Sequence, residues 1–229
     1  MARRQKRPAK SAQSSKSGQG SKSGQGKARS AASAPASLEE RAVDAALAIA
    51  ADRGWGAVSL AAVAEQADTS LAALYAVLPS KGAILDAFAR RIDRATLAGV
   101  EIDAGDSGGV RDRLFDVIMR SFDALEPHRR AVAALVSDLP RNPLAALCQG
   151  ARLLRSLAWM AAAAGVDTSG PLGVLRVKAL GAAYLVVLRT WLADESTDKA
   201  RTMAALDRAL RNLEMIAQTA SLRRRTATP

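Results

Sequence analysis

The chain has 229 residues, enough for one large domain or two small ones. Hydrophobic residues make up 49% and aromatic residues only 3%, so Ala, Leu and Val must build the core, which favours packed helices over a sheet. One Cys excludes an internal disulfide, and the absence of a visible signal peptide predicts a cytoplasmic protein. The net charge of +11 is carried by the two ends, since residues 38–222 sum to −1.

Residues 1–37 have low complexity and contain the hexapeptide SKSGQG twice, at 15–20 and 21–26. They hold nine Lys or Arg and no acid, and too few apolar residues to form a core, which predicts a disordered basic arm. The arm is either a solubilising tail or a segment that lies along DNA phosphates, and we favour the second because a DNA-binding motif follows it. Residues 223–229, with three arginines, form a second basic tail.

The first predicted helix runs from residue 38 to Arg53. Ser37 and Glu40 have the spacing of a capping box, and Gly54 ends the helix. Its apolar stripe at helical spacing is Val43, Ala46, Leu47 and Ala50.

Two short helices are predicted within residues 58–81. Ser59 caps the first, the turn Asp68-Thr69-Ser70 follows, and Ser70 caps the second, which Pro79 ends. Two short helices joined by a tight turn form a helix-turn-helix, whose second helix can enter the DNA major groove.

This stretch resembles the N-terminal domain of TetR/AcrR-type transcriptional regulators. The matching positions are Val63-Ala64, Ala67, Thr69-Ser70, Leu74-Tyr75, Leu78 and Ser80-Lys81. The resemblance implies an all-α fold of about nine helices: a three-helix DNA-binding domain at 38–100 and a helical bundle for ligand binding and dimerisation at 101–222. It implies DNA contacts from Ser59, Thr69, Ser70, Leu71, Ala73, Tyr75 and Lys81.

The second helix departs from that family pattern. Asp68 stands where the family usually has Gly, and Leu71, Ala72, Ala73, Ala76 and Val77 replace residues that are often polar or aromatic. Alanine and leucine can contact a thymine methyl but few other base-edge groups. Residues 38–81 also carry a net charge of −3, which disfavours phosphate binding by this domain alone.

Helices are predicted for the remainder of the chain. Their ranges are Ser80 to about Gly99, Val110–Leu125, Pro127–Leu139, Pro143 to about Ala164, Pro171–Asp194 and about Thr197–Leu222. The fifth range is apolar nearly all round and is predicted to be the central buried helix, and its longest apolar run is too short to span a bilayer.

The family resemblance implies a homodimer and a small apolar ligand. The dimer-interface candidates are Tyr184, Leu188, Trp191, Met203, Leu206, Leu210 and Leu213, although the last four can equally pack on their own chain. The ligand-pocket candidates are Phe115, Met119, Phe122, Leu147, Trp159 and Met160, which can equally fill the core.

Signs of catalytic or metal chemistry are absent from the sequence. His128 is the single histidine and is predicted to face solvent, while Cys148 is predicted to be a small core residue. We therefore predict neither an enzyme nor a cofactor.

Two functions remain open. The first is a DNA-binding regulator, a repressor whose operator binding a small ligand modulates, associated with the bacterial nucleoid when DNA-bound. The second is a lipid- or partner-binding protein of the same fold that does not read DNA and is related to ubiquinone biosynthesis. The alternative rests on the Ala/Leu-rich helix, the charge of −3 and the segment TWLADES at 190–196.

Overall fold

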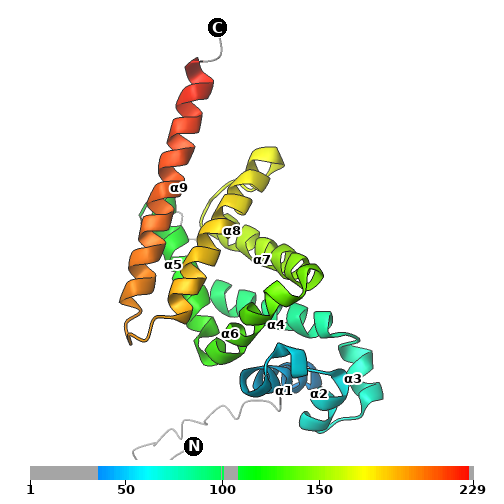
Figure 1. Cartoon of the computed structure of the whole chain (residues 1–229). Coiled ribbons are helices and arrows are strands. Elements are labelled where there is room, and N and C mark those ends of the chain that lie inside the picture. The colour runs from blue at the N-terminus through cyan, green and yellow to red at the C-terminus, as the bar shows by residue number, and fades with distance from the viewer. Residues whose placement is uncertain (1–35, 99, 101–107, 227–229) are drawn as a thin grey trace, which may run out of the picture. The chain divides into compact units, whose positions relative to one another are not determined.

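The computed structural model describes residues 36–98, 100 and 108–226, without the side chains of residues 219–226. Within these residues the chain forms nine α-helices, three short 3-10 helices and no strand, so the predicted all-α fold is confirmed (Figure 1). The α-helices are α1 (Leu38–Arg53), α2 (Leu60–Gln66), α3 (Leu71–Val77), α4 (Lys81–Leu97), α5 (Val110–Leu125), α6 (Arg129–Asp138), α7 (Pro143–Ala163), α8 (Gly170–Leu192) and α9 (Ala200–Thr226). The 3-10 helices are η1 (Trp55–Ala57), η2 (Glu126–His128) and η3 (Leu139–Arg141).

Serine side chains begin each of the first four α-helices. The hydroxyl oxygens of Ser37, Ser59, Ser70 and Ser80 accept hydrogen bonds from the backbone N–H three residues later, at 3.1–3.2 Å. Each bond satisfies a donor that the first turn of a helix leaves free, so the boundaries of α1 to α4 are set locally. Glu40 completes the predicted capping box of α1.

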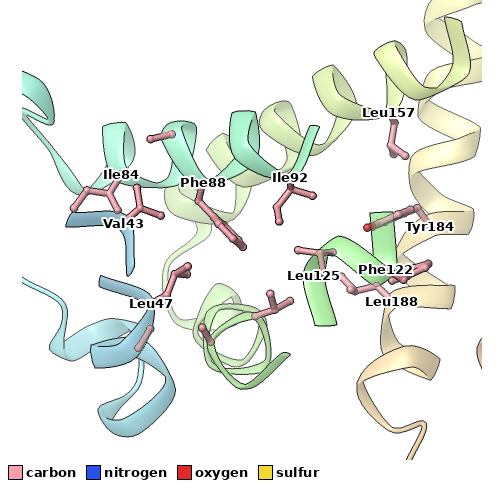
Figure 2. Close-up of a cluster of buried hydrophobic side chains, with 14 of the residues drawn as sticks. Val43, Leu47, Ile84, Phe88, Ile92, Phe122, Leu125, Leu157, Tyr184 and Leu188 are labelled. Carbon is pink, nitrogen blue, oxygen red and sulfur yellow. The ribbon is translucent and has the colours of Figure 1, made fainter. Parts of the chain in front are cut away.

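Helix α4 joins the N-terminal helices to the C-terminal ones. Ile84 and Phe88 on its first half lie in the same buried cluster as Val43 and Leu47 of α1 (Figure 2). Ile92, on its second half, continues the cluster toward α5, α7 and α8, and α4 packs against α1, α5 and α7. A displacement of α4 would therefore change its packing against α1 and also against α5 and α7.

Helix α8 differs from its prediction as a central buried helix. Val177, Tyr184, Val187 and Leu188 are buried, but the opposite face is exposed and carries apolar residues beside the cations Lys178 and Arg189. The exposed apolar residues of this face are Leu172, Val174, Leu175, Ala182, Leu185 and Val186. Composition cannot distinguish a helix covered on all sides by its own chain from one with an uncovered apolar face.

The corner between α8 and α9 is held by polar contacts around Trp191, which is 0% exposed. The indole N–H donates to Oε2 of Glu126 at 3.1 Å, and the guanidinium of Arg129 lies over the ring with 4.6 Å to its centroid. Arg129 also donates to the backbone oxygens of Trp191 and Asp194, at 2.7 and 2.6 Å. The Asp194 carboxylate accepts four hydrogen bonds from Ser196 and Thr202, which lower the pKa of its carboxyl.

The two basic ends of the chain were predicted as an arm at residues 1–37 and a tail at residues 223–229. The predicted arm lies outside the described residues except for Ala36 and Ser37. Helix α9 extends to Thr226, so the backbone of residues 223–226, predicted as part of a tail, is helical.

Candidate nucleic-acid interface

Helices α2 and α3 form the predicted helix-turn-helix, with α3 at the edge of the N-terminal helices (Figure 1). Between them Asp68 has a positive φ of 50°, a conformation that Asp tolerates better than most residues with a Cβ. Ser70 then begins α3 through its bond from the Ala73 N–H. Helix α3 packs on α1 and α2 through Leu74, its single buried residue.

The outer surface of α3 is open to solvent. Leu71 is 51% exposed and Tyr75 is 64% exposed. Ala72, Ala73 and Ala76 are also exposed, so the helix presents methyl groups and one hydroxyl. A phenol at this position can donate a hydrogen bond to a phosphate while its ring covers apolar surface.

The structure places six of the seven predicted DNA-contact residues in three groups. Leu71, Ala73 and Tyr75 are exposed on α3. Ser59 and Ser70 are exposed, but their oxygens accept the helix-capping bonds, which leaves each hydroxyl proton for a phosphate. Thr69 is half-buried in the turn.

The phosphate contact of Lys81 stays a prediction, but its side chain also has a partner within the chain. Its Nζ donates to the backbone oxygen of Trp55 at 3.1 Å and lies 5.2 Å from the centroid of the indole ring. Burial lowers the pKa of the Lys81 ammonium, and Asp138 acts in the opposite direction. The ammonium therefore joins α4 to η1, and the sequence could not indicate this because Trp55 lies 26 residues away.

The six ligand-pocket candidates do not line one cavity. Phe122 and Met160 are buried in the core, with Phe122 stacked on Tyr184 at 5.1 Å between ring centroids. Leu147 and Trp159 are exposed, and Met119 is half-buried. Phe115 and Trp159 line two different open grooves. Phe115 lies in a groove of about 490 Å³ between α5 and α9, together with Met203 and Leu210. Trp159 lies in a groove of about 530 Å³ between α3, α4 and α7, together with Val77 and Asp86.

The dimer-interface candidates are mostly buried within their own chain. Tyr184, Leu188, Trp191, Leu206 and Leu210 belong to the core, and Met203 and Leu213 are half-buried. Their burial disagrees with a direct contact to a second subunit and agrees with the alternative that the α9 seam packs on its own chain. The predicted interface did not include the exposed apolar residues of α8, such as Leu175, Leu185 and Val186.

His128 and Cys148 also differ from their predictions. His128 is half-buried, with Nε2 3.2 Å from Nη2 of Arg91 and its ring edge-on to Phe88. Cys148 is exposed. Among the described residues no three His, Cys, Asp or Glu side chains are grouped to hold a metal ion. Helix α8 alone in the described part has the length and composition of a membrane span, as buried core helices also do.

Comparisons with known proteins agree with this geometry. Residues 42–88, which include α2 and α3, match the sequence model of the bacterial regulatory proteins, tetR family. No curated protein sequence matches the chain.

Solved structures of regulators share the fold over most of the chain. The TetR transcriptional regulator from Nitrosomonas europaea ATCC 19718 is 23% identical with a TM-score of 0.63, over 79% of this chain and 99% of that one. A TetR transcriptional regulator from Rhodococcus sp. RHA1 is 19% identical with a TM-score of 0.54, over 77% and 94%. Salmonella enterica GusR is 21% identical with a TM-score of 0.54, also over 77% and 94%. The predicted resemblance is thus confirmed: residues 42–88 match the sequence model of the tetR family of bacterial regulatory proteins, and the chain shares the fold of solved TetR regulators.

Proposed function

We propose that the chain is a homodimeric transcriptional repressor that binds a palindromic DNA operator through α3. The main support is the exposure of α3, which is capped by Ser70, anchored by Leu74 and open on its remaining surface. A helix held in this way can enter a major groove without rearrangement of the N-terminal helices. The protein is then cytoplasmic, associated with the nucleoid when bound to DNA, and without enzymatic activity.

The basic arm supplies most of the phosphate binding in this proposal. Residues 38–81 carry a net charge of −3, and the ammonium of Lys81 already donates one hydrogen bond to the backbone oxygen of Trp55. Residues 1–37 hold nine Lys or Arg and no acid. Because affinity for DNA rests largely on phosphate neutralisation, removal of these residues should weaken binding at every DNA sequence.

The uncovered face of α8 is the proposed dimer interface. It presents Leu175, Ala182, Leu185 and Val186 to solvent, and Met215 and Ile216 of α9 are also exposed. An uncovered apolar face of this kind is typical of a surface that a partner covers. A two-fold dimer would place two copies of α3 on two half-sites.

Ligand control would act through α4. Arg152 of α7 donates to Asp86 at 2.8 Å and to the backbone oxygen of Gly82 at 3.2 Å, and Ser156 donates to Asp93 at 2.9 Å. Asp93 lines the groove of about 530 Å³, and its Oδ1 is buried without a hydrogen-bond partner in the described chain, so a small apolar ligand with one polar group would find a contact there. Its binding would shift the population of α4 positions and the separation of the two α3 helices.

The alternative, a lipid- or partner-binding protein related to ubiquinone biosynthesis, is favoured by the apolar surface of α3. The TWLADES segment supports it less, because Trp191 and Asp194 make contacts within the chain. Native mass spectrometry distinguishes the two: a co-purifying isoprenoid or phospholipid supports the alternative.

A gel-shift assay tests the proposed function. The probe is the DNA upstream of the gene, at low salt, with the wild-type protein and an Ala72→Glu variant. Ala72 is exposed, so the variant should fold, and its carboxylate would lie against the DNA. With excess non-specific competitor DNA present, we expect a clear shift for the wild type and a much weaker one for the variant, because the arm that both proteins keep binds phosphates at any sequence. Equal shifts for both proteins would exclude α3 as the reading helix.

A further inference from the structure

Helix α3 lacks the side chains that read most base pairs. Its sequence, LAALYAV, contains no charged or amide residue, and Tyr75 has its single polar side chain. Guanine is usually recognised by Arg or Lys and adenine by Asn or Gln, through paired hydrogen bonds. If α3 enters a major groove, its direct contacts with bases must therefore be predominantly apolar.

The positions of the alanines favour a close approach to the DNA. At 100° per residue, Ala72 and Ala76 lie on the side of α3 opposite the buried Leu74. Side chains that end at Cβ allow the helix axis to lie deep in the groove. Leu71 is the large apolar group of the first turn, the part of a reading helix that contacts base edges.

Thymine alone among the four bases presents a methyl group in the major groove. We infer that the operator half-site is read through thymine C5-methyl groups that contact Leu71, Ala72, Ala73 and Ala76. This inference rests on the proposed function, and it names the base chemistry that α3 recognises. It predicts half-sites that contain thymines on the strand edges facing α3.

The test uses a duplex selected by the full-length protein from a random library. Each thymine of the half-site is replaced in turn by deoxyuridine, which keeps the hydrogen-bonding pattern and removes the methyl group. We expect about fourfold weaker binding for each contacted thymine, the effect of one buried methyl group. Thymines in the flanks serve as the control and should show no change.

A protein variant links the effect to α3. In Leu71→Ala the loss caused by deoxyuridine should disappear at one position and remain at the others. Leu144→Ala is the matched control, since Leu144 is 70% exposed on α7 and lies outside the motif. If a duplex is selected but every deoxyuridine replacement leaves its affinity unchanged, the inference is wrong and the proposed function stands. If no duplex is selected at low salt, the proposed function itself fails.

Discussion

The ammonium of Lys81 is held against Trp55, by a 3.1 Å hydrogen bond to the backbone oxygen and by the indole ring 5.2 Å away. This contact joins the start of α4 to η1, the segment that connects α1 to α2. It fixes the position of α4 relative to the helix-turn-helix.

Replacement of Lys81 by Met should therefore reduce stability. The variant keeps most of the apolar stem but loses the hydrogen bond and the cation–π contact, and we expect a loss of about 1–2 kcal/mol in the free energy of unfolding. Urea denaturation measures it, with the exposed Arg90→Met as the control. The salt dependence of DNA binding should stay unchanged in Lys81→Met. A shallower slope would show that the ammonium contacts phosphate after all.

His128 predicts a pH dependence of stability. Burial and then the nearby Arg91 guanidinium lower the pKa of His128 below its usual 6.5, while Asp44 acts in the opposite direction. As the pH falls below 6.5 the unfolded chain binds the proton first, so the free energy of unfolding decreases until the pH passes below the folded-state pKa. Urea denaturation between about pH 7.5 and 5 should show this decrease in the wild type and a flatter profile in His128→Gln. Equal slopes for the two proteins would contradict the assignment.

Arg129 and Arg130 are neighbours with very different environments. Arg129 binds Glu126, the backbone oxygens of the α8–α9 corner and the face of Trp191. Arg130 is exposed and donates to Asp52 and to the Ala51 oxygen on α1. Arg129→Met should cost about 2 kcal/mol or more, because several charge-assisted bonds are lost, and Arg130→Met under about 0.5 kcal/mol. Thermal denaturation compares them, and similar losses would mean that the corner is not a stabilising contact.

The proposed dimer interface predicts the effect of a charge on α8. Val186 is 60% exposed on the uncovered face, so Val186→Glu should leave the fold intact and bury a carboxylate between subunits. We expect at least about a 100-fold weaker dimer by analytical ultracentrifugation, and a circular dichroism spectrum like that of the wild type. Leu144→Glu on α7 is the control. An unchanged dimer would place the interface elsewhere.

Features set by local sequence could be predicted from it. The serine caps of α1 to α3 and the buried stripe of α1 depend on residues within one or two turns, and both are found as expected. The contacts of Lys81 and His128 could not be foreseen, because their partners Trp55 and Arg91 come from distant positions.

The dimer and pocket candidates show a second limit. An apolar residue at helical spacing must be covered, but the pattern does not indicate by which chain. Trp191 and Leu210 are covered within their own chain, whereas Val186, in the same kind of apolar run, is not. The apolar residues buried within the chain determine the fold, and the apolar residues that stay exposed mark the candidate interfaces.

A salt titration of DNA binding measures how much of the affinity comes from the cations of the basic arm. Fluorescence anisotropy would follow the selected duplex with the full chain and with a chain that begins at Ala36, both checked for helix content. We predict that the full chain binds, and that its slope of log affinity against log salt is steeper than that of the shortened chain by about 0.9 for each arm cation that neutralises a phosphate. The absence of binding by the folded full chain at low salt would contradict it.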